Sequence, residues 1–229
     1  TYLERWFIIG SKVPDVGIRQ TLEVTPDGKY RLRAAVGNIQ QNGTNSTVNA
    51  GEKQTGVTLY AGIYDMPVDT MKAHKDLYFT VVDGQVTIGF KAENATGNWI
   101  CLDNVRLYYL GGNTPEDYAA YLSRYADDVR EELQARHIQS AGRQAVEAAI
   151  EAAEKASGAE NPDEKAMAEA KAALDEAVTA METSAVIYDV LADALRYAGQ
   201  VKGWYEEDEE KRGKMETAYQ AAHEVWENT

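Results

Sequence analysis

The residue types that most often perform catalysis are few in this sequence and far apart. The three histidines, His74, His137 and His223, fall in different segments, and the single cysteine, Cys101, has no histidine near it in the chain. No serine-hydrolase elbow, zinc-protease helix, phosphate-binding loop or paired-cysteine motif is present. In the first half the acidic residues lie singly, so no two are marked as a general acid and base. We expect no catalytic residues, and we expect Cys101 to be a small buried side chain.

Aromatic rings beside amide side chains offer a different chemistry, because the C–H faces of sugars stack on rings while their hydroxyl groups hydrogen-bond to amides. Tyr60 and Tyr64 alternate with Leu59, Ala61 and Ile63. In one continuous strand both tyrosines would lie opposite the apolar face, so we expect both to face outward and to be available to a ligand. The other aromatic candidates, for which packing in the core or between domains is the alternative, are Trp6, Trp99, Tyr108 and Tyr109.

Charge and glycine are distributed unevenly between the two halves of the chain. Residues 1–111 contain 11 basic and 11 acidic side chains, whereas residues 112–229 contain 12 and 26 and so carry the whole net charge of −14. Glycine divides 12 to 6 across the same point. We therefore place a boundary between two domains, 1–111 and 112–229, at Gly111-Gly112.

The strong acidity argues against binding to nucleic acid phosphates, which need basic side chains, and against an anionic membrane surface. No apolar run approaches the roughly 20 residues needed to span a bilayer, and the opening TYLERWFIIG does not have the pattern of a signal peptide. The chain begins without Met and close to a strand. We expect a fragment or mature piece of a longer protein, with other domains of that protein as its neighbours.

Apolar residues alternate with polar ones along residues 1–110, which is the period of β-strands. The alternating runs are 18–24, 30–36, 57–63, 77–81, 86–90 and 99–110. Asp27-Gly28 and Asp83-Gly84 separate adjacent runs, and such turns are typical of hairpins. About seven short strands with tight turns predict an antiparallel β-sandwich. The stretch 38–55 is predicted to be a long polar loop, either functional or simply tolerated at the surface.

Beyond Gly112 the apolar period changes to 3.6, which predicts helices. Thr114 is the predicted N-cap of the first helix, with Pro115 and two acidic residues in its first turn. Further helices are predicted at about 140–157, from 161–163 to about 183, at 185–200 and at 206–227. The apolar stripe of the first helix consists of Tyr118, Tyr121, Leu122, Tyr125, Val129 and Leu133.

The apolar positions of this second half repeat with a shift of 45 residues. Val146, Ala149, Ile150 and Ala153 map onto Leu191, Ala194, Leu195 and Ala198, and Ala170, Ala173, Leu174, Ala177 and Met181 map onto Met215, Ala218, Tyr219, Ala222 and Trp226. A helical hairpin cannot bury its apolar face alone, so neighbouring units are expected to pack together. The pattern resembles the FIVAR-type helical repeats that serve as spacers in bacterial surface proteins.

Four segments of the first half carry a second resemblance: QTLEV with PDGKYRLRAA, GVTLYAG, LYFTVVDGQVTIGFKA and NWICLDNVRLYYLG. Together they resemble the galactose-binding-like jelly-roll sandwich, most of all the carbohydrate-binding-module-like domains in surface glycan-handling proteins of gut Bacteroidetes. The resemblance covers nearly all of residues 1–111. The residues at the positions of that pattern are Gln20, Gly28, Tyr30, Asn98, Trp99, Asp103, Asn104 and Leu107.

The resemblance implies a multidomain chain of all-β plus all-α type, with an N-terminal antiparallel jelly-roll β-sandwich and a C-terminal helical bundle or repeat, at the cell surface or secreted. It implies that Trp99 supports the fold and that Asn94 and Asn98 lie near the sugar contacts at the loop end. It also implies a structural calcium held by Glu4 and Asp103. Carboxylate oxygens suit calcium, and the alternative is that both are ordinary polar strand residues.

The sequence therefore predicts a non-catalytic carbohydrate-binding module with a helical spacer, belonging to a larger bacterial protein that acts on glycans. Its predicted ligand is a poly- or oligosaccharide, and its predicted ligand-binding residues are Tyr60, Tyr64, Asn94 and Asn98. The alternative is a structural or adhesion module that has no sugar site.

Overall fold

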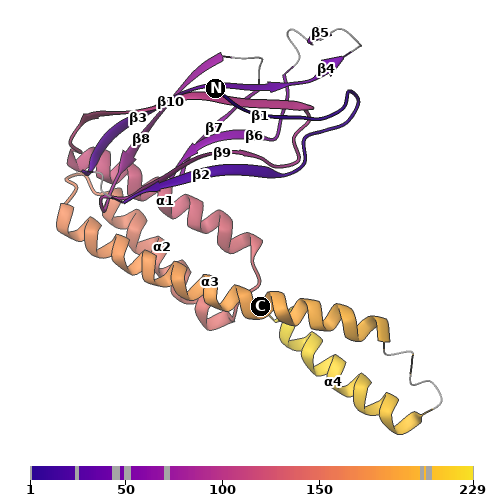
Figure 1. Cartoon of the computed structure of the whole chain (residues 1–229). Coiled ribbons are helices and arrows are strands. Elements are labelled where there is room, and N and C mark those ends of the chain that lie inside the picture. The colour runs from indigo at the N-terminus through magenta and orange to yellow at the C-terminus, as the bar shows by residue number, and fades with distance from the viewer. Residues whose placement is uncertain are drawn as a thin grey trace. The chain divides into compact units, whose positions relative to one another are not determined.

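The computed structural model describes residues 2–23, 26–42, 47–48, 53–69, 73–201, 204 and 208–228. It divides into two compact units, Thr1–Tyr118 and Ala119–Thr229 (Figure 1). Strands make up the first unit up to Gly111, and helices make up the second. The predicted mixture of β and α structure is therefore confirmed.

Two four-stranded antiparallel sheets form the first unit. The first sheet has the order β1-β10-β3-β8 and the second has the order β2-β9-β6-β7, with a small β4-β5 pair beside them. The strands are β1 (Leu3–Trp6), β2 (Val16–Leu22), β3 (Gly28–Ile39), β4 (Gln41–Asn42), β5 (Thr47–Val48), β6 (Val57–Ala61), β7 (Tyr64–Pro67), β8 (Ala73–Val81), β9 (Val86–Ala92) and β10 (Trp99–Gly111). Two such sheets fit a β-sandwich.

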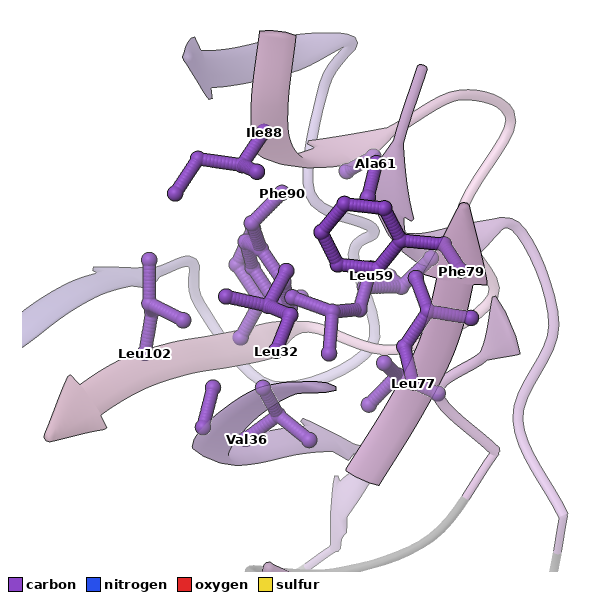
Figure 2. Close-up of a cluster of buried hydrophobic side chains, with 14 of the residues drawn as sticks. Leu32, Val36, Leu59, Ala61, Leu77, Phe79, Ile88, Phe90 and Leu102 are labelled. Atoms are coloured by element: carbon purple, nitrogen blue, oxygen red, sulfur yellow. The ribbon is translucent and has the colours of Figure 1, made fainter. Parts of the chain in front are cut away.

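Alternate residues of both sheets point into one shared apolar core (Figure 2). Leu32 of β3 and Leu102 of β10 come from the first sheet, and Leu59 of β6 and Phe90 of β9 come from the second. Burying one aliphatic or aromatic side chain of this size contributes about 1.5–3 kcal/mol. The alternation in the sequence thus sets both the strands and the face that each strand buries.

The two predicted hairpin turns do not join paired strands. Asp83 and Gly84 have positive φ values of 69° and 66°, as a tight turn requires. They connect β8 of the first sheet to β9 of the second, however. In the same way, the strands on either side of Asp27, β2 and β3, belong to different sheets. The hairpin prediction is wrong because turn residues specify a reversal of the chain but not which sheet the next strand joins.

The predicted polar loop at 38–55 is shorter than expected. Strand β3 continues through Asn38 to Ile39, and 41–42 pair with 47–48 as a two-stranded ladder. Asn38 is buried, and its Nδ2 donates to the carbonyl oxygens of Thr55 (3.2 Å) and Val68 (3.0 Å). These two bonds satisfy both N–H groups of the buried amide, whereas its Oδ1 has no partner among the described residues. The rest of the predicted loop, at 43–46 and 49–52, lies outside the described residues.

Four helices follow the sandwich: α1 (Pro115–Ala135), α2 (Ser140–Ser157), α3 (Glu164–Val201) and α4 (Glu209–Glu227). Thr114 caps α1 as predicted, because its Oγ1 accepts the N–H of Asp117 (3.2 Å) while Asp117 Oδ2 accepts the N–H of Thr114 (2.9 Å). The predicted break near 184 is wrong. No glycine or proline occurs between 164 and 198, so nothing ends the helix there and α3 is continuous.

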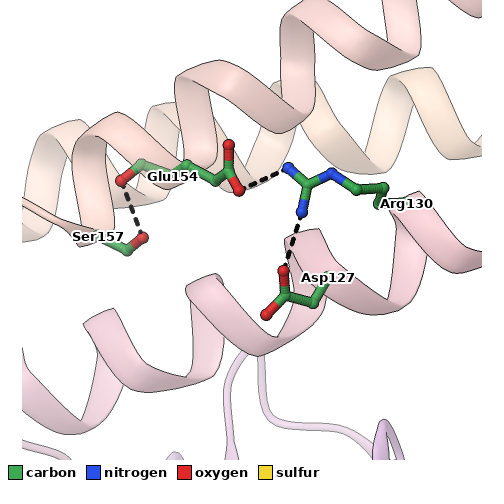
Figure 3. Close-up of polar contacts among 4 residues, drawn as sticks. All are labelled: Asp127, Arg130, Glu154 and Ser157. Atoms are coloured by element: carbon green, nitrogen blue, oxygen red, sulfur yellow. Dashed lines mark hydrogen bonds and ion pairs between the residues drawn. The ribbon is translucent and has the colours of Figure 1, made fainter.

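Polar contacts join α1 to its neighbours within the second unit. Arg130 of α1 donates from Nη1 to Asp127 (2.9 Å) and from Nη2 to Glu154 of α2 (Figure 3). Tyr125 of α1 donates its hydroxyl to Asp175 of α3 (2.9 Å), whose other oxygen pairs with Lys171 (2.8 Å). Burial, together with the negative charge of Asp175, raises the pKa of Tyr125 well above its usual range. These contacts tie three helices around the stripe that contains Leu122 and Val129.

The two copies of the 45-residue repeat differ in burial. The first copy buries Val146, Ala149, Ile150 and Ala153, whereas in the second copy only Leu195 of the four equivalents is buried. No described residue of α4 is buried. Similar spacing of apolar residues therefore does not produce equally packed hairpins, and the FIVAR assignment stays a prediction. None of the described helices is both long and apolar enough to cross a bilayer.

Candidate functional site

The outer face of the second sheet carries an open depression that we call the Tyr60 trough. Neighbouring strands place Asp65 of β7, Tyr60 of β6, Gly89 of β9 and Arg19 of β2 in one row across the sheet. At a strand spacing of about 4.8 Å, this row of four residues spans about 14 Å. An acid, an aromatic ring, a bare backbone position and a cation therefore follow one another across the surface.

Gly89 allows the ring of Tyr60 to lean over the sheet. A Cβ atom on Gly89 would lie 2.4 Å from both Cζ and Oη of Tyr60 and 2.6 Å from its Cε1, far inside van der Waals contact. The ring can take this position only because β9 has no side chain there. Tyr60 remains partly exposed, so its ring forms part of an accessible surface.

Charged side chains surround the depression, whose volume is about 340 Å³. Lys91 pairs with Glu93 (2.9 Å), and Asp15 Oδ1 accepts the backbone N–H of Asn94 (2.8 Å). In the part of the chain that the structure describes, Arg19 makes no ion pair. The residues that line the depression are Asp15, Val16, Gly17, Ile18, Arg19, Tyr60, Lys91, Ala92 and Glu93.

Two of the four predicted ligand residues belong to this region. Tyr60 lines the trough, and Asn94 is an exposed residue with φ 52° that follows Glu93 at its end. The hydrogen bond between the Asn94 N–H and Asp15 ties the loop to a residue of the trough. A bound molecule in the trough would therefore lie beside the Asn94 loop.

Tyr64 lies on the opposite side of the sheet from Tyr60. Gly62, with φ 57°, and Ile63 form a tight turn that pairs Ala61 with Tyr64. Paired residues share a face, so Tyr64 follows Ala61 inward and packs against Phe79 with ring centroids 6.3 Å apart. The expectation that both tyrosines face outward fails because the turn breaks the alternation between them.

Asn98 is completely buried. Its Nδ2 donates to the carbonyl oxygen of Phe7 (3.1 Å), and its Oδ1 accepts the backbone N–H of Gln41 (2.8 Å). Both ends of the amide therefore hold neighbouring segments together. In this structure the side chain is therefore not accessible to a ligand.

Trp99 is half-buried and lies outside the core cluster, on the outer face of the first sheet. It is paired in register with Trp6, which is exposed. Trp6 Nε1 donates to Gln41 (2.7 Å) and Trp99 Nε1 donates to Glu4 (2.9 Å). This tryptophan pair is a second aromatic surface and the main competitor of the Tyr60 trough. Cys101, as predicted, is buried and makes no disulfide.

The predicted calcium ligands already interact with other groups. Glu4 accepts the indole N–H of Trp99, and Asp103 accepts the backbone N–H of Asn104 (2.7 Å). Among the residues that the structure describes, no three or more histidine, cysteine, aspartate or glutamate side chains are grouped to hold a metal ion. Calcium binding at Glu4 and Asp103 stays a prediction.

Gly89, Arg19 and Lys91 belong to the trough but were not predicted. The sequence did contain a signal for Gly89, since VTIGF places a glycine at an outward position of an otherwise regular strand. Such a glycine often marks the close approach of another group. Arg19 and Lys91 gave no signal, because their proximity to Tyr60 depends on the strand order β2-β9-β6.

Comparison with known proteins finds similarity to several solved structures, including the following two. No family model matches the sequence, and no curated protein does. A structure of TmCBM61 in complex with β-1,4-galactotriose has 18% identity and a TM-score of 0.30, with 42% of this chain and 63% of that chain covered. A cyclase from Fischerella sp. TAU has 19% identity and a TM-score of 0.34, with coverage of 49% and 65%. The chain thus spans less than two thirds of each, and function must be inferred from the trough itself.

Proposed function

We propose that the first unit is a non-catalytic carbohydrate-binding module and that the Tyr60 trough holds the sugar. One observation carries the proposal: the ring of Tyr60 leans over Gly89 in an open depression with charged side chains around it. Sugar rings present C–H groups that pack on aromatic faces, and hydroxyl groups that need polar partners. The trough offers both kinds of contact on one rigid sheet.

Polar side chains on different sides of the Tyr60 ring would form hydrogen bonds with the hydroxyl groups of the sugar. Arg19 donates hydrogen bonds from one side of Gly89, and Lys91 and Glu93 provide a donor and an acceptor near the Asn94 loop. Because strands rather than loops hold Arg19, Tyr60 and Lys91, their spacing does not need to change on binding. An open, rigid surface of this kind suits the middle of a glycan chain.

The wider context is part of the same proposal. The chain is a piece of a larger surface or secreted bacterial glycan-handling protein, its sandwich is a jelly roll, and its helical unit is a FIVAR-like spacer. A calcium ion held by Glu4 and Asp103 would serve the fold and not the sugar. These points are supported by the resemblance of the sequence to such domains.

Glycan arrays followed by affinity gel electrophoresis test the proposal. Tyr60→Ala should weaken retention at least tenfold, which corresponds to about 1.4 kcal/mol. Tyr78→Ala is the matched control, because Tyr78 is an exposed tyrosine (60% exposed) on the other sheet. Its removal should change retention less than about twofold.

Two results would overturn the proposal. Equal loss in both variants would place the sugar outside the trough. Absence of retention on all plant and host glycans would favour the alternative, in which the chain is a structural or adhesion spacer with no sugar site.

A further inference from the structure

The two edge strands β1 and β2 border an open apolar cleft between the sheets. Each is the first strand of its sheet in the order β1-β10-β3-β8 or β2-β9-β6-β7 (Figure 1). Two adjoining cavities, of about 380 and 180 Å³, lie between them and share Leu3, Ile18, Phe90 and Leu102 as lining residues. We call this region the edge cleft, and it reaches the core residues Leu32 and Leu59.

The apolar side chains at the mouth of the edge cleft are incompletely covered. Leu3 is 52% exposed, Val16 is 42% exposed and Ile18 is 46% exposed. Their register partners on the adjacent strands are all buried: Leu102 of β10, and Ala92 and Phe90 of β9. The apolar inner faces of the two sheets thus extend to the edge strands β1 and β2, where their side chains are exposed to solvent.

The backbone at this edge indicates what kind of molecule would cover it. Along one side β2 pairs with β9, and no further strand pairs with its other side among the described residues. Its sequence, VGIRQTL, has no proline and no inward-facing charge, which are the usual protections of an exposed edge. A small apolar molecule would fill the cleft but leave these backbone groups unpaired, whereas a β-strand would satisfy both.

The charged side chains at the edge cleft indicate which residues a bound strand would carry. Arg5 pairs in register with Ile100, a core residue, so it points toward the cleft, where its guanidinium lies 5.1 Å from the centroid of Phe7. Among the described residues, no acidic side chain lines the larger cavity. In the smaller one the carboxylate of Glu4 accepts the indole N–H of Trp99 on the other face. An occupant with an acidic side chain near Arg5 would complement the cleft.

We propose that the edge cleft receives an extended strand of a partner polypeptide, which pairs with the free edge of β2 and places apolar side chains over Ile18 and Leu3. The partner strand has apolar residues at alternate positions and an acidic residue at the end that lies near Arg5. The strand would lie beside β2 at the edge of the second sheet, next to Val16 and Ile18, which also line the Tyr60 trough. The test below measures the binding of a peptide, so its outcome does not depend on whether the trough binds a sugar.

A synthetic peptide tests this proposal on the whole 229-residue chain. The probe is a fluorescein-labelled nine-residue peptide of alternating threonine and valine, with glutamate at one terminal valine position. Fluorescence anisotropy should show saturable binding at micromolar concentrations. Exchanging the glutamate for lysine should weaken binding, and a central proline should abolish it, since proline removes a ladder hydrogen bond.

Matched variants of β2 locate the binding. Ile18→Lys and Val16→Lys each place a charge at the mouth of the cleft and should weaken binding at least tenfold. Thr21→Lys changes the outward face of the same strand, where Thr21 contacts Thr87 (2.8 Å), and should change binding less than twofold. Circular dichroism melting confirms that each variant is folded, and hydrogen exchange should show that the peptide protects amides of 16–22.

Three outcomes would overturn the proposal. The first is that the wild-type chain shows no saturable binding of the peptide. The second is that the inward and outward variants lose affinity equally. The third is a dimer in sedimentation velocity that Ile18→Lys dissociates, because a second copy of this chain would then occupy the edge.

Discussion

Tyr60 and Gly89 are register partners on adjacent strands, and the phenol end of Tyr60 occupies the space where a side chain of residue 89 would stand. The ring can lie over the sheet because Gly89 has no side chain at that point. Its position depends on β9 as much as on β6. A change that leaves Tyr60 itself untouched can therefore displace the ring.

Gly89→Ala should reduce glycan retention nearly as much as the loss of Tyr60, because the added methyl group would lie 2.4 Å from the ring and force it to move. Gly17→Ala is the matched control. Gly17 also lines the trough, but a Cβ there meets its nearest atom, Cβ of Lys91, at an ordinary 3.5 Å. Affinity electrophoresis should show a loss of about tenfold for the first variant and less than twofold for the second. Unchanged retention by Gly89→Ala would show that the position of the ring does not matter.

Asn98→Ala should destabilise the first unit without acting on a ligand directly. The substitution removes the partners of the Phe7 carbonyl and the Gln41 N–H, and each buried polar group left without a partner costs about 1–3 kcal/mol. Asn94→Gly, at an exposed position where φ is 52° and glycine adds no strain, should cost less than about 1 kcal/mol. Urea denaturation measures both free energies of unfolding, and equal values would contradict the structural role of Asn98.

Asp175→Ala should destabilise the helical unit by about 1–3 kcal/mol, because its carboxylate accepts the Tyr125 hydroxyl and neutralises the buried Lys171 ammonium. Adding Lys171→Met should recover part of the loss, since the double variant no longer buries that charge. Thermal melting followed by circular dichroism at 222 nm compares the three proteins. A double variant that is less stable than Asp175→Ala would contradict this account.

The N-terminal cap of α1 should make the free energy of unfolding depend on pH through Asp117. The backbone N–H of Thr114, and next the Lys29 side chain, lower the pKa of Asp117 below its ordinary value of 3.8. A carboxyl group whose pKa is lower in the folded state stabilises the protein above the unfolded pKa, and this contribution disappears as the pH falls through the folded pKa. Asp117→Asn should therefore be less stable than the wild type at pH 7 and approach it below about pH 3. Denaturation between pH 7 and pH 2.5 checks this, and a constant difference across that range would contradict it.

The local elements could be predicted from the sequence because their signals are local. Alternation located the strands that contain Leu32, Leu59 and Phe90, and Thr114 marked the start of α1. Two local signals were nevertheless misread. The two-residue turn at Gly62 moved Tyr64 to the inner face, and α3 passes through the expected break near 184.

The site could be predicted only in part because it is assembled across strands. Tyr60 was found from its own strand, but Arg19 and Gly89 reach it through the order β2-β9-β6. The same limit explains the wrong hairpins, since Asp83-Gly84 carries no information about which sheet receives the next strand. Burial of Asn98 also depends on distant segments, at Phe7 and Gln41.

The most direct test of the central claim is a titration of the chain with an oligosaccharide selected on the array, followed by ¹H–¹⁵N correlation spectra. A sugar held in the Tyr60 trough should shift the amide signals of 17–19, 58–60 and 89–91 in a saturable manner, and Gly89→Ala should abolish the shifts. Shifts centred on the Trp6 and Trp99 pair, with the trough unaffected, would contradict the claim.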